Sequence, residues 1–321
     1  MAVVDMPLAE LKKYKGTNPK PSDFDSFWDK ALTEMRAVDA EVELKPAAFK
    51  VNFADCFDMY FTGVGGARVY AKVVIPEKKH RKSPALLQFH GYSGNSGDWV
   101  HLLGYAASGF VVAAMDCRGQ GGRSEDVGGV KGNTLHGHII RGLDDKPEKL
   151  LYRQIYLDTA QLAGIVMGME HVDEERVAVI GGSQGGALAV ACAALEPRIA
   201  KVASVYPFLS DYKRVWELDL ETRVYVELKD FFRNYDPLHK REEEIFTRLG
   251  YIDVHHLAGR IEGDLLMGVT LQDNVCPPST QFAIYNHIRS PKTMVLYPDF
   301  GHEAIPKRAD RNFEFICQLC T

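Results

Sequence analysis

The chain has 321 residues, 46% of them hydrophobic, and a formal net charge of −5, which is ordinary for a globular α/β protein. Its 38 basic and 43 acidic side chains form no basic stripe, which argues against a nucleic acid partner. No apolar run approaches the ~20 residues that span a bilayer, and the N-terminus lacks the features of a signal peptide, so we expect a cytoplasmic protein without a membrane partner.

The N-terminal part of the sequence predicts a packed helix followed by a β-hairpin. Residues 22–38 are amphipathic, with Ser22 as the expected N-cap and apolar side chains at helical spacing. Two runs rich in β-branched and aromatic residues, 51–62 and 68–75, flank the glycine-rich segment 63–66. We expect the helix to pack as an arm and the two runs to pair as antiparallel strands.

The rest of the chain alternates between short apolar runs and helical patterns. Six runs are expected to be parallel strands covered on both faces: residues 85–89, 110–115, 177–180, 202–205, 265–269 and 293–297. Five helices are expected between and after them: residues 99–108, 152–170, 183–195, 278–288 and 307–318. Because strands alternate with helices, the sequence predicts an α/β fold with a doubly wound, mostly parallel sheet.

Two longer segments interrupt this alternation. Residues 119–151 are rich in glycine and histidine, and residues 210–260 are dense in charged and aromatic side chains. Long insertions after strands of such a sheet tend to line the ligand crevice. We therefore expect residues 210–260 to form a helical excursion near the active site, within one domain that spans residues 1–321.

The strongest functional signal is the sequence Gly181-Gly-Ser183-Gln-Gly185, which follows an apolar run and opens a helical stretch. A strand, a Gly-x-Ser-x-Gly turn and a helix form the nucleophile elbow of a hydrolase. The turn is so sharp that side chains at 181 and 185 would collide, and the serine is held in a strained backbone conformation. Ser183 is therefore predicted to be the nucleophile.

A serine nucleophile needs a base, and the base needs a carboxylate that fixes its tautomer. His302 follows the last predicted strand and is the expected base, whereas His287 lies inside a predicted helix. Asp273 lies in the loop after the run 265–269 and is the preferred acid. Asp299, which is close to His302 in sequence, is the alternative acid.

An oxyanion hole needs two backbone N–H donors, one from the residue after the nucleophile and one from the loop after the third strand. Gln184 takes the first position and Tyr92 the second. We expect the Tyr92 ring and residues 206–208, Pro207 among them, to close a short acyl pocket. His90 is interpreted as a structural side chain beneath this loop.

Several other polar residues are interpreted as structural. Arg118 follows the fourth strand of the fold and is expected to form an ion pair or to anchor its loop. His255 and His256 are interpreted as surface residues. No cluster has the spacing of a closed metal site, so neither a metal nor a cofactor is expected. The six cysteines are expected to be free thiols.

Together these motifs resemble the cephalosporin C deacetylase and acetyl xylan esterase family, carbohydrate esterase family 7. The resemblance covers nearly the whole chain and rests on Arg-Gly-Gln at 118–120, Gly-Gly-Ser-Gln-Gly at 181–185, His-Glu at 302–303 and the acid loop 273–280. It implies an α/β-hydrolase fold and a homo-hexamer. It also implies the triad Ser183, Asp273 and His302, with an oxyanion hole at Tyr92 and Gln184.

The activity that the resemblance implies is removal of acetyl groups from short acetylated sugars and from cephalosporin C. Two alternatives stay open, a general short-chain carboxylesterase and a peptidase of the same fold. A binding protein without catalytic activity is disfavoured, because all three members of the predicted triad are present.

Overall fold

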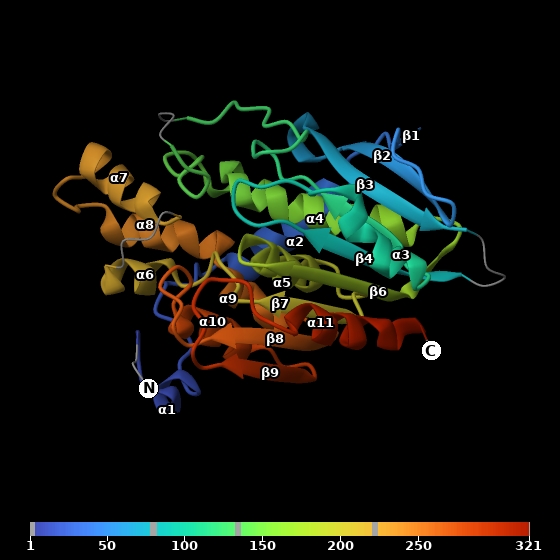
Figure 1. Ribbon diagram of the computed structural model, residues 1–321. Coiled ribbons are helices and arrows are strands. Elements are labelled where there is room, and N and C mark those ends of the chain that lie inside the picture. Colours follow the sequence, from blue (N-terminus) through green and yellow to red (C-terminus); the bar gives the residue numbers. More distant parts are fainter. Residues whose placement is uncertain (1–3, 78–81, 132–135, 220–223, 321) are drawn as a thin grey trace.

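The computed structural model describes residues 4–77, 82–131, 136–219 and 224–320 (Figure 1). Within these residues nine strands form one sheet, in the order β1-β2-β3-β5-β4-β6-β7-β8-β9. The strands are β1 (Glu43–Pro46), β2 (Ala54–Thr62), β3 (Arg68–Pro76), β4 (Ser83–Phe89), β5 (Val111–Met115), β6 (Val172–Gly182), β7 (Lys201–Val205), β8 (Asp264–Thr270) and β9 (Lys292–Tyr297). Neighbouring strands are parallel from β5 through β9, whereas β1, β2 and β3 pair antiparallel.

Helices cover both faces of the sheet. They are α1 (Leu8–Leu11), α2 (Phe24–Arg36), α3 (Leu103–Ala107), α4 (Leu151–Met167), α5 (Gln184–Leu195), α6 (Tyr212–Leu218), α7 (Val226–Tyr235), α8 (Glu242–Leu249), α9 (Val254–Leu257), α10 (Pro278–His287) and α11 (Arg308–Cys317). The helices α4 and α5 pack together on one face, and α3 and α11 lie against strands of the sheet on the other. No helix in the described part of the chain is long and apolar enough to cross a bilayer.

Burial on both faces explains the continuous apolar runs of the central strands. In β4, Leu87 belongs to the larger core on the α4 and α5 side, and its neighbour Leu86 belongs to the smaller core on the α3 side. Successive side chains of a strand point to opposite faces, so both must be apolar when both faces are covered. The doubly wound sheet predicted from the sequence is confirmed, and so is the hairpin, whose register pairs Thr62 with Arg68.

Two local predictions differ from the structure. The N-cap of α2 is Asp23 and not Ser22, because the Phe24 N–H donates to the Pro21 carbonyl at 3.2 Å and closes a turn that contains Ser22. The strand β1 was not predicted. All four of its residues are exposed, so the alternation between buried and exposed positions that reveals a strand is missing.

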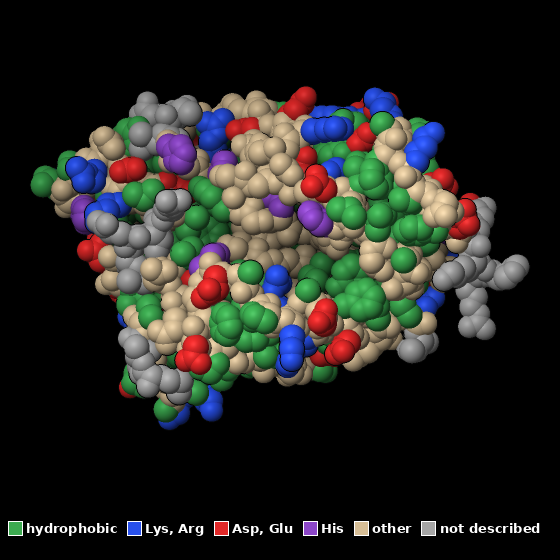
Figure 2. Space-filling view, viewed as in Figure 1, with side chains coloured by type: hydrophobic (Ala, Val, Ile, Leu, Met, Phe, Trp, Pro, Cys, Tyr) green, Lys and Arg blue, Asp and Glu red, His purple; other side chains and the backbone are tan. Residues whose placement is uncertain are grey.

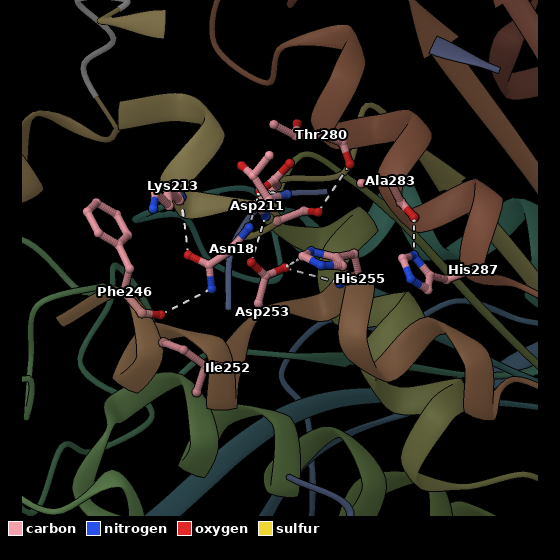
Figure 3. A network of polar contacts seen from close by, with 12 residues as sticks. Asn18, Asp211, Lys213, Phe246, Ile252, Asp253, His255, Thr280, Ala283 and His287 are labelled. Atoms are coloured by element: carbon pink, nitrogen blue, oxygen red, sulfur yellow. Dashed lines mark hydrogen bonds and ion pairs between the residues drawn. The ribbon is translucent and has the colours of Figure 1, made fainter. Parts of the chain in front are cut away.

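The described residues of the segment 210–260 include the helices α6, α7, α8 and α9, of which α6, α7 and α8 project beyond the sheet at the left of Figure 1. A buried carboxylate at its start fixes the N-terminal segment. Asp211 accepts hydrogen bonds from the Tyr14 hydroxyl at 2.7 Å and from the Thr17 backbone N–H at 3.0 Å. It also accepts the backbone N–H of Asn18 at 2.9 Å (Figure 3). The N-terminal segment is therefore held by residues almost 200 positions away.

The interpretation of His255 and His256 as surface residues is wrong. His255 is only 1% exposed, and its Nδ1 lies 2.6 Å from the Asp253 carboxylate, which in turn accepts the backbone N–H of Asp211 at 2.8 Å (Figure 3). The backbone at Gly16 covers the ring, since a Cβ there would lie 2.8 Å from the His255 Nε2. The N-terminal segment thus closes over α9.

This buried network also affects protonation. Burial alone would lower the pKa of His255, but the charge and the hydrogen bond of Asp253 outweigh it and raise the pKa. The ring of His256 lies beside that of His255, and burial together with this neighbour lowers the pKa of His256 to about 4. Within the described residues, Asp253, His255 and His256 offer ligand atoms within 4.8 Å of one another, a cluster that their interpretation as surface residues did not anticipate.

Candidate active site

Ser183 lies at the sharp turn between β6 and α5. Its backbone has φ 55° and ψ −122°, a conformation that side chains disfavour. A Cβ at Gly181 would lie 2.2 Å from the Gly185 backbone, and a Cβ at Gly185 would lie 2.1 Å from the Phe89 carbonyl oxygen. The predicted collision is therefore present at both glycines, and the turn presents the serine at the carboxyl end of the sheet.

His302 and Asp273 lie next to the serine. The Nε2 atom of His302 is 3.0 Å from Ser183 Oγ, and its Nδ1 atom is 2.9 Å from Asp273 Oδ2. The Asp273 carboxylate is fully buried, and it also accepts the backbone N–H groups of Val275 and Cys276, each at 2.8 Å. The loops after β8 and β9 thus bring a carboxylate, an imidazole and a hydroxyl into one line of hydrogen bonds.

The two alternatives weighed for these positions lie elsewhere. Asp299 is exposed to solvent, while Asp273 is the carboxylate that touches His302. His287 is the last residue of α10, and its Nδ1 atom lies 2.8 Å from the Ala283 carbonyl oxygen. Its ring faces His255, 5.3 Å between ring centroids, so His287 belongs to the network of Figure 3 and not to the serine.

Gln184 follows the serine directly, and Tyr92 lies on the loop after β4. Gln184 is the first residue of α5, where the N–H groups of the opening turn have no partner within the helix. Tyr92 lies in a turn after β4, which the Gly94 N–H closes by donating to Gly91 O at 3.0 Å, with Ser93 at φ 57°. Both predicted oxyanion donors therefore belong to well-defined local elements, the first turn of α5 and the turn after β4.

A buried amide cluster joins these two elements. The side-chain oxygen of Gln184 accepts the Tyr152 hydroxyl at 2.7 Å and the Gln120 amide at 2.9 Å. The Gln120 side chain in turn accepts the Ser93 backbone N–H at 2.9 Å. The side chain of Gln120 therefore connects the start of α5 with the Tyr92 turn.

The segment after β7 packs against the elbow. The Phe208 N–H donates to the Ser183 carbonyl at 3.1 Å, and the Phe208 ring meets the Tyr92 ring edge to face at 5.6 Å. Pro207 is buried against the first turn of α5, where a Cβ at Gly186 would lie 3.3 Å from its Cα. In this segment the contact with Tyr92 is made by Phe208.

The structural interpretations of Arg118 and His90 are confirmed. Arg118 is buried and forms a two-pronged ion pair with Asp158, at 2.6 and 2.7 Å. His90 Nε2 accepts the Cys117 N–H at 2.9 Å, so its Nδ1 carries the proton that it donates to the Gly91 carbonyl at 2.7 Å. Burial lowers the pKa of His90, which keeps the ring neutral in this role.

Two residues near the serine gave little or no signal in the sequence. Cys276 is a buried thiol that lies against the Ser183 side chain, and burial raises its pKa well above the usual value. Within the described residues, Asp273, Cys276 and His302 offer ligand atoms within 4.8 Å of one another. Glu227 on α7 accepts the Tyr92 hydroxyl, a contact across 135 positions that no local pattern could reveal.

The face seen in Figure 2 is hollowed near its centre, and histidine side chains gather around the hollow. A serine with an imidazole beside it and a buried carboxylate behind the imidazole is the arrangement that nucleophilic acyl transfer requires.

Known proteins support this chemistry. The acetyl xylan esterase (AXE1) family model matches residues 1–319. Acetyl esterase Axe7A of Xylanibacter ruminicola is 28% identical over 302 residues, and the match covers 91% of this chain and 65% of that longer protein.

Two solved structures are similar over their whole length. Acetyl xylan esterase 1 from Thermoanaerobacterium sp. JW/SL YS485 is 61% identical, with a TM-score of 0.97 and coverage of 99% of this chain and 100% of that one. The acetyl xylan esterase from Paenibacillus sp. R4 is 38% identical, with a TM-score of 0.92 and coverage of 97% and 99%. The chain therefore has the α/β-hydrolase fold and belongs to the acetyl xylan esterase (AXE1) family, whose members are carboxylic ester hydrolases.

Proposed function

We propose that the protein is a serine esterase that removes acetyl groups from short acetylated xylo-oligosaccharides and from acetate esters of the cephalosporin C type. The observation that carries this proposal is the line of hydrogen bonds from Asp273 through His302 to Ser183, at 2.9 and 3.0 Å, on a strained nucleophile elbow. The family and the two similar esterase structures support acetyl esters as the substrate class.

The proposed reaction has two acyl-transfer steps. His302 Nε2 takes the hydroxyl proton of Ser183 while the oxygen attacks the acetyl carbonyl, and Asp273 holds the ring by its Nδ1 proton. The backbone N–H groups of Tyr92 and Gln184 stabilise the oxyanion. The bond from the carbonyl carbon to the sugar oxygen then breaks, and His302 gives its proton to that oxygen, which leaves as a hydroxyl. Water attacks the acetyl-enzyme in the reverse sense and releases acetate. These steps need no metal or cofactor.

We also propose a short acyl pocket, closed by the Tyr92 ring and residues 206–208, with Pro207 as part of its wall. The edge-to-face contact between Tyr92 and Phe208 supports this, because two packed rings leave little freedom to admit a longer chain. Each methylene that does not fit is expected to cost about 1 to 3 kcal/mol.

The remaining proposals concern the whole chain. Residues 1–321 form one domain, with residues 22–38 as an arm and residues 210–260 as an excursion near the site. The family resemblance supports a homo-hexamer. The buried thiols Cys56, Cys117, Cys192 and Cys276 support a reducing compartment such as the cytoplasm.

Two measurements test the function. Acetate release from acetylated xylo-oligosaccharides should fall by about 10⁴ to 10⁶ in Ser183→Ala, with the fold intact by circular dichroism. For the wild type, kcat/KM should be highest for p-nitrophenyl acetate, fall at the butyrate and nearly vanish at the octanoate. Activity that persists in Ser183→Ala would refute the nucleophile, and a profile that rises toward octanoate would favour a general carboxylesterase.

A further inference from the structure

Glu227 is a buried carboxylate in the first turn of α7. It is 2% exposed, whereas its neighbour Val226 on α7 is 42% exposed. Burying a charge is costly unless hydrogen bonds compensate it. Among the described residues, its hydrogen-bond donors are a hydroxyl and two backbone N–H groups: the Tyr92 hydroxyl donates to Oε1, and Ile139 and Ile140 donate to Oε2 at 2.7 and 3.0 Å.

These contacts make Glu227 the meeting point of three segments. It belongs to α7, it accepts two N–H groups from the loop that leads into α4, and it accepts the hydroxyl of the Tyr92 turn. The loop closes tightly over it, since a Cβ at Gly137 would lie 2.2 Å from the carboxylate. The same loop also reaches Tyr92 directly, because the His138 N–H donates to the Tyr92 hydroxyl at 3.1 Å.

The position of the Tyr92 backbone depends on these contacts. On one side the turn is fixed by the Ser93 N–H, which donates to Gln120 at 2.9 Å. On the other side it is fixed by the Tyr92 side chain, through Glu227 and through ring contacts with His138 at 4.8 Å and Phe208 at 5.6 Å. An oxyanion donor must be held to a fraction of an ångström, because an error of about 1 Å can cost 10²-fold in rate.

We propose that Glu227 is a positioning residue for the reaction: it holds the Tyr92 hydroxyl so that the Tyr92 backbone N–H stays aimed at the oxyanion beside Ser183. This inference rests on the proposed function, in which Tyr92 is an oxyanion donor. It makes α7 part of the support of the proposed active site.

The free-energy cost of burying the charged Glu227 carboxylate allows an experiment to distinguish a positioning role from a structural one. Burial raises the pKa of Glu227 to about 7, so above that pH the folded protein must keep a charge that it disfavours. Removing the charge in Glu227→Gln should therefore preserve or raise the Tm at about pH 8. The glutamine oxygen can still accept the two backbone N–H groups, but its amide can no longer accept the Tyr92 proton. Activity should fall while stability does not.

The test compares Glu227→Gln with Tyr92→Phe, which removes the same hydrogen bond from the other side and keeps the backbone N–H. For both variants kcat on p-nitrophenyl acetate should fall about 10- to 100-fold, with KM changed by less than about twofold. The Ki of a methyl trifluoromethyl ketone, which forms an oxyanion on the serine, should rise by the same factor as kcat falls. The double variant should lose little more than either single one.

Glu243→Gln on α8 is the matched control, because Glu243 is an exposed glutamate of the same excursion, and it should behave as the wild type. Full kcat in Glu227→Gln would overturn the inference, and so would a fall in kcat that is matched by a fall in Tm. Labelling of Ser183 with a fluorophosphonate distinguishes failure of the proposed function from failure of the proposed role of Glu227. If Ser183→Ala stayed active the proposed function would fall, whereas a labelled, fully active Glu227→Gln would refute only the role of Glu227.

Discussion

At the scale of single residues, Asp273 is held more firmly than any surface carboxylate could be. It is fully buried, and it accepts two backbone N–H groups in addition to the His302 ring. Asp273→Asn should lower kcat about 10⁴-fold, because the amide favours the wrong tautomer of His302. Asp299→Asn, at an exposed position on the loop that carries His302, is the control and should cost less than about tenfold. Steady-state kinetics on p-nitrophenyl acetate would decide, and the reverse ranking would assign the acid role to Asp299.

The glycines of the elbow provide a second prediction at this scale. Gly181→Ala should destabilise the protein by at least about 1 to 3 kcal/mol, because its Cβ would lie 2.2 Å from the Gly185 backbone. Gly164 offers a matched comparison, since it is exposed in α4 and a Cβ there would meet nothing within 4 Å. Gly164→Ala should stabilise by about 0.5 to 1 kcal/mol. Urea unfolding measures both, and an unchanged midpoint for Gly181→Ala would contradict the steric account.

A site residue can be predicted from the sequence when neighbouring residues form a recognisable motif around it, and not when its role depends on distant contacts. Ser183 lies in a motif whose glycines are required by the turn itself, and Asp273 and His302 follow from the rule that partners lie after later strands of the sheet. Glu227 carries no such signal, because its role arises from contacts with residues 92, 139 and 140. His255 was misread for a similar reason: a segment that lies far away in sequence covers it.

At the scale of elements, the six parallel strands were predictable because burial on both faces makes them continuous apolar runs. The ends of the strands were less predictable: β6 spans Val172–Gly182, and its charged residues 173–176, outside the apolar run 177–180, gave no strand signal. The short edge strand β1 escaped because its side chains bury nothing. The start of β6 and the whole of β1 are defined by pairing with neighbouring strands, which is a non-local interaction.

The buried pair of His255 in α9 and Asp253 at its N-cap, which the N-terminal segment covers, predicts that the free energy of unfolding depends on pH. The folded pKa of His255 lies above its unfolded value, so the stabilisation is complete below about pH 6.5 and is lost as the pH rises through the folded pKa. His255→Asn should cost about 3 to 5 kcal/mol near pH 6, because Asp253 loses its buried partner, and clearly less near pH 9.

Chemical denaturation at the two pH values measures this difference. His101→Asn is the control, because His101 is exposed, and it should change stability by less than about 0.5 kcal/mol at either pH. An equal loss for His255→Asn at both pH values would show that His255 is not protonated in the folded protein.

At the scale of the whole molecule, the proposed hexamer predicts elution near six times the 35.9 kDa subunit mass. A ring of six subunits would restrict the sites to small substrates, so long acetylated xylan should be deacetylated more slowly per acetyl group than its short oligosaccharides. Light scattering coupled to gel filtration measures the mass. A fully active monomer would refute the assembly and leave the proposed triad untouched.

The anchoring of the N-terminal segment by Asp211 has a consequence for biosynthesis. Thr17 and Asp211 are 194 positions apart, and the Trp28 indole donates to the carbonyl of Tyr251 across 223 positions. The ribosome therefore releases the first helices before these partners exist, and the aromatic side chains of α2, buried in the finished protein, are not fully covered until residues 211–251 have been made. The N-terminal segment can close fully only after that point, and until then residues 24–36 offer an incompletely covered aromatic segment to which chaperones can bind.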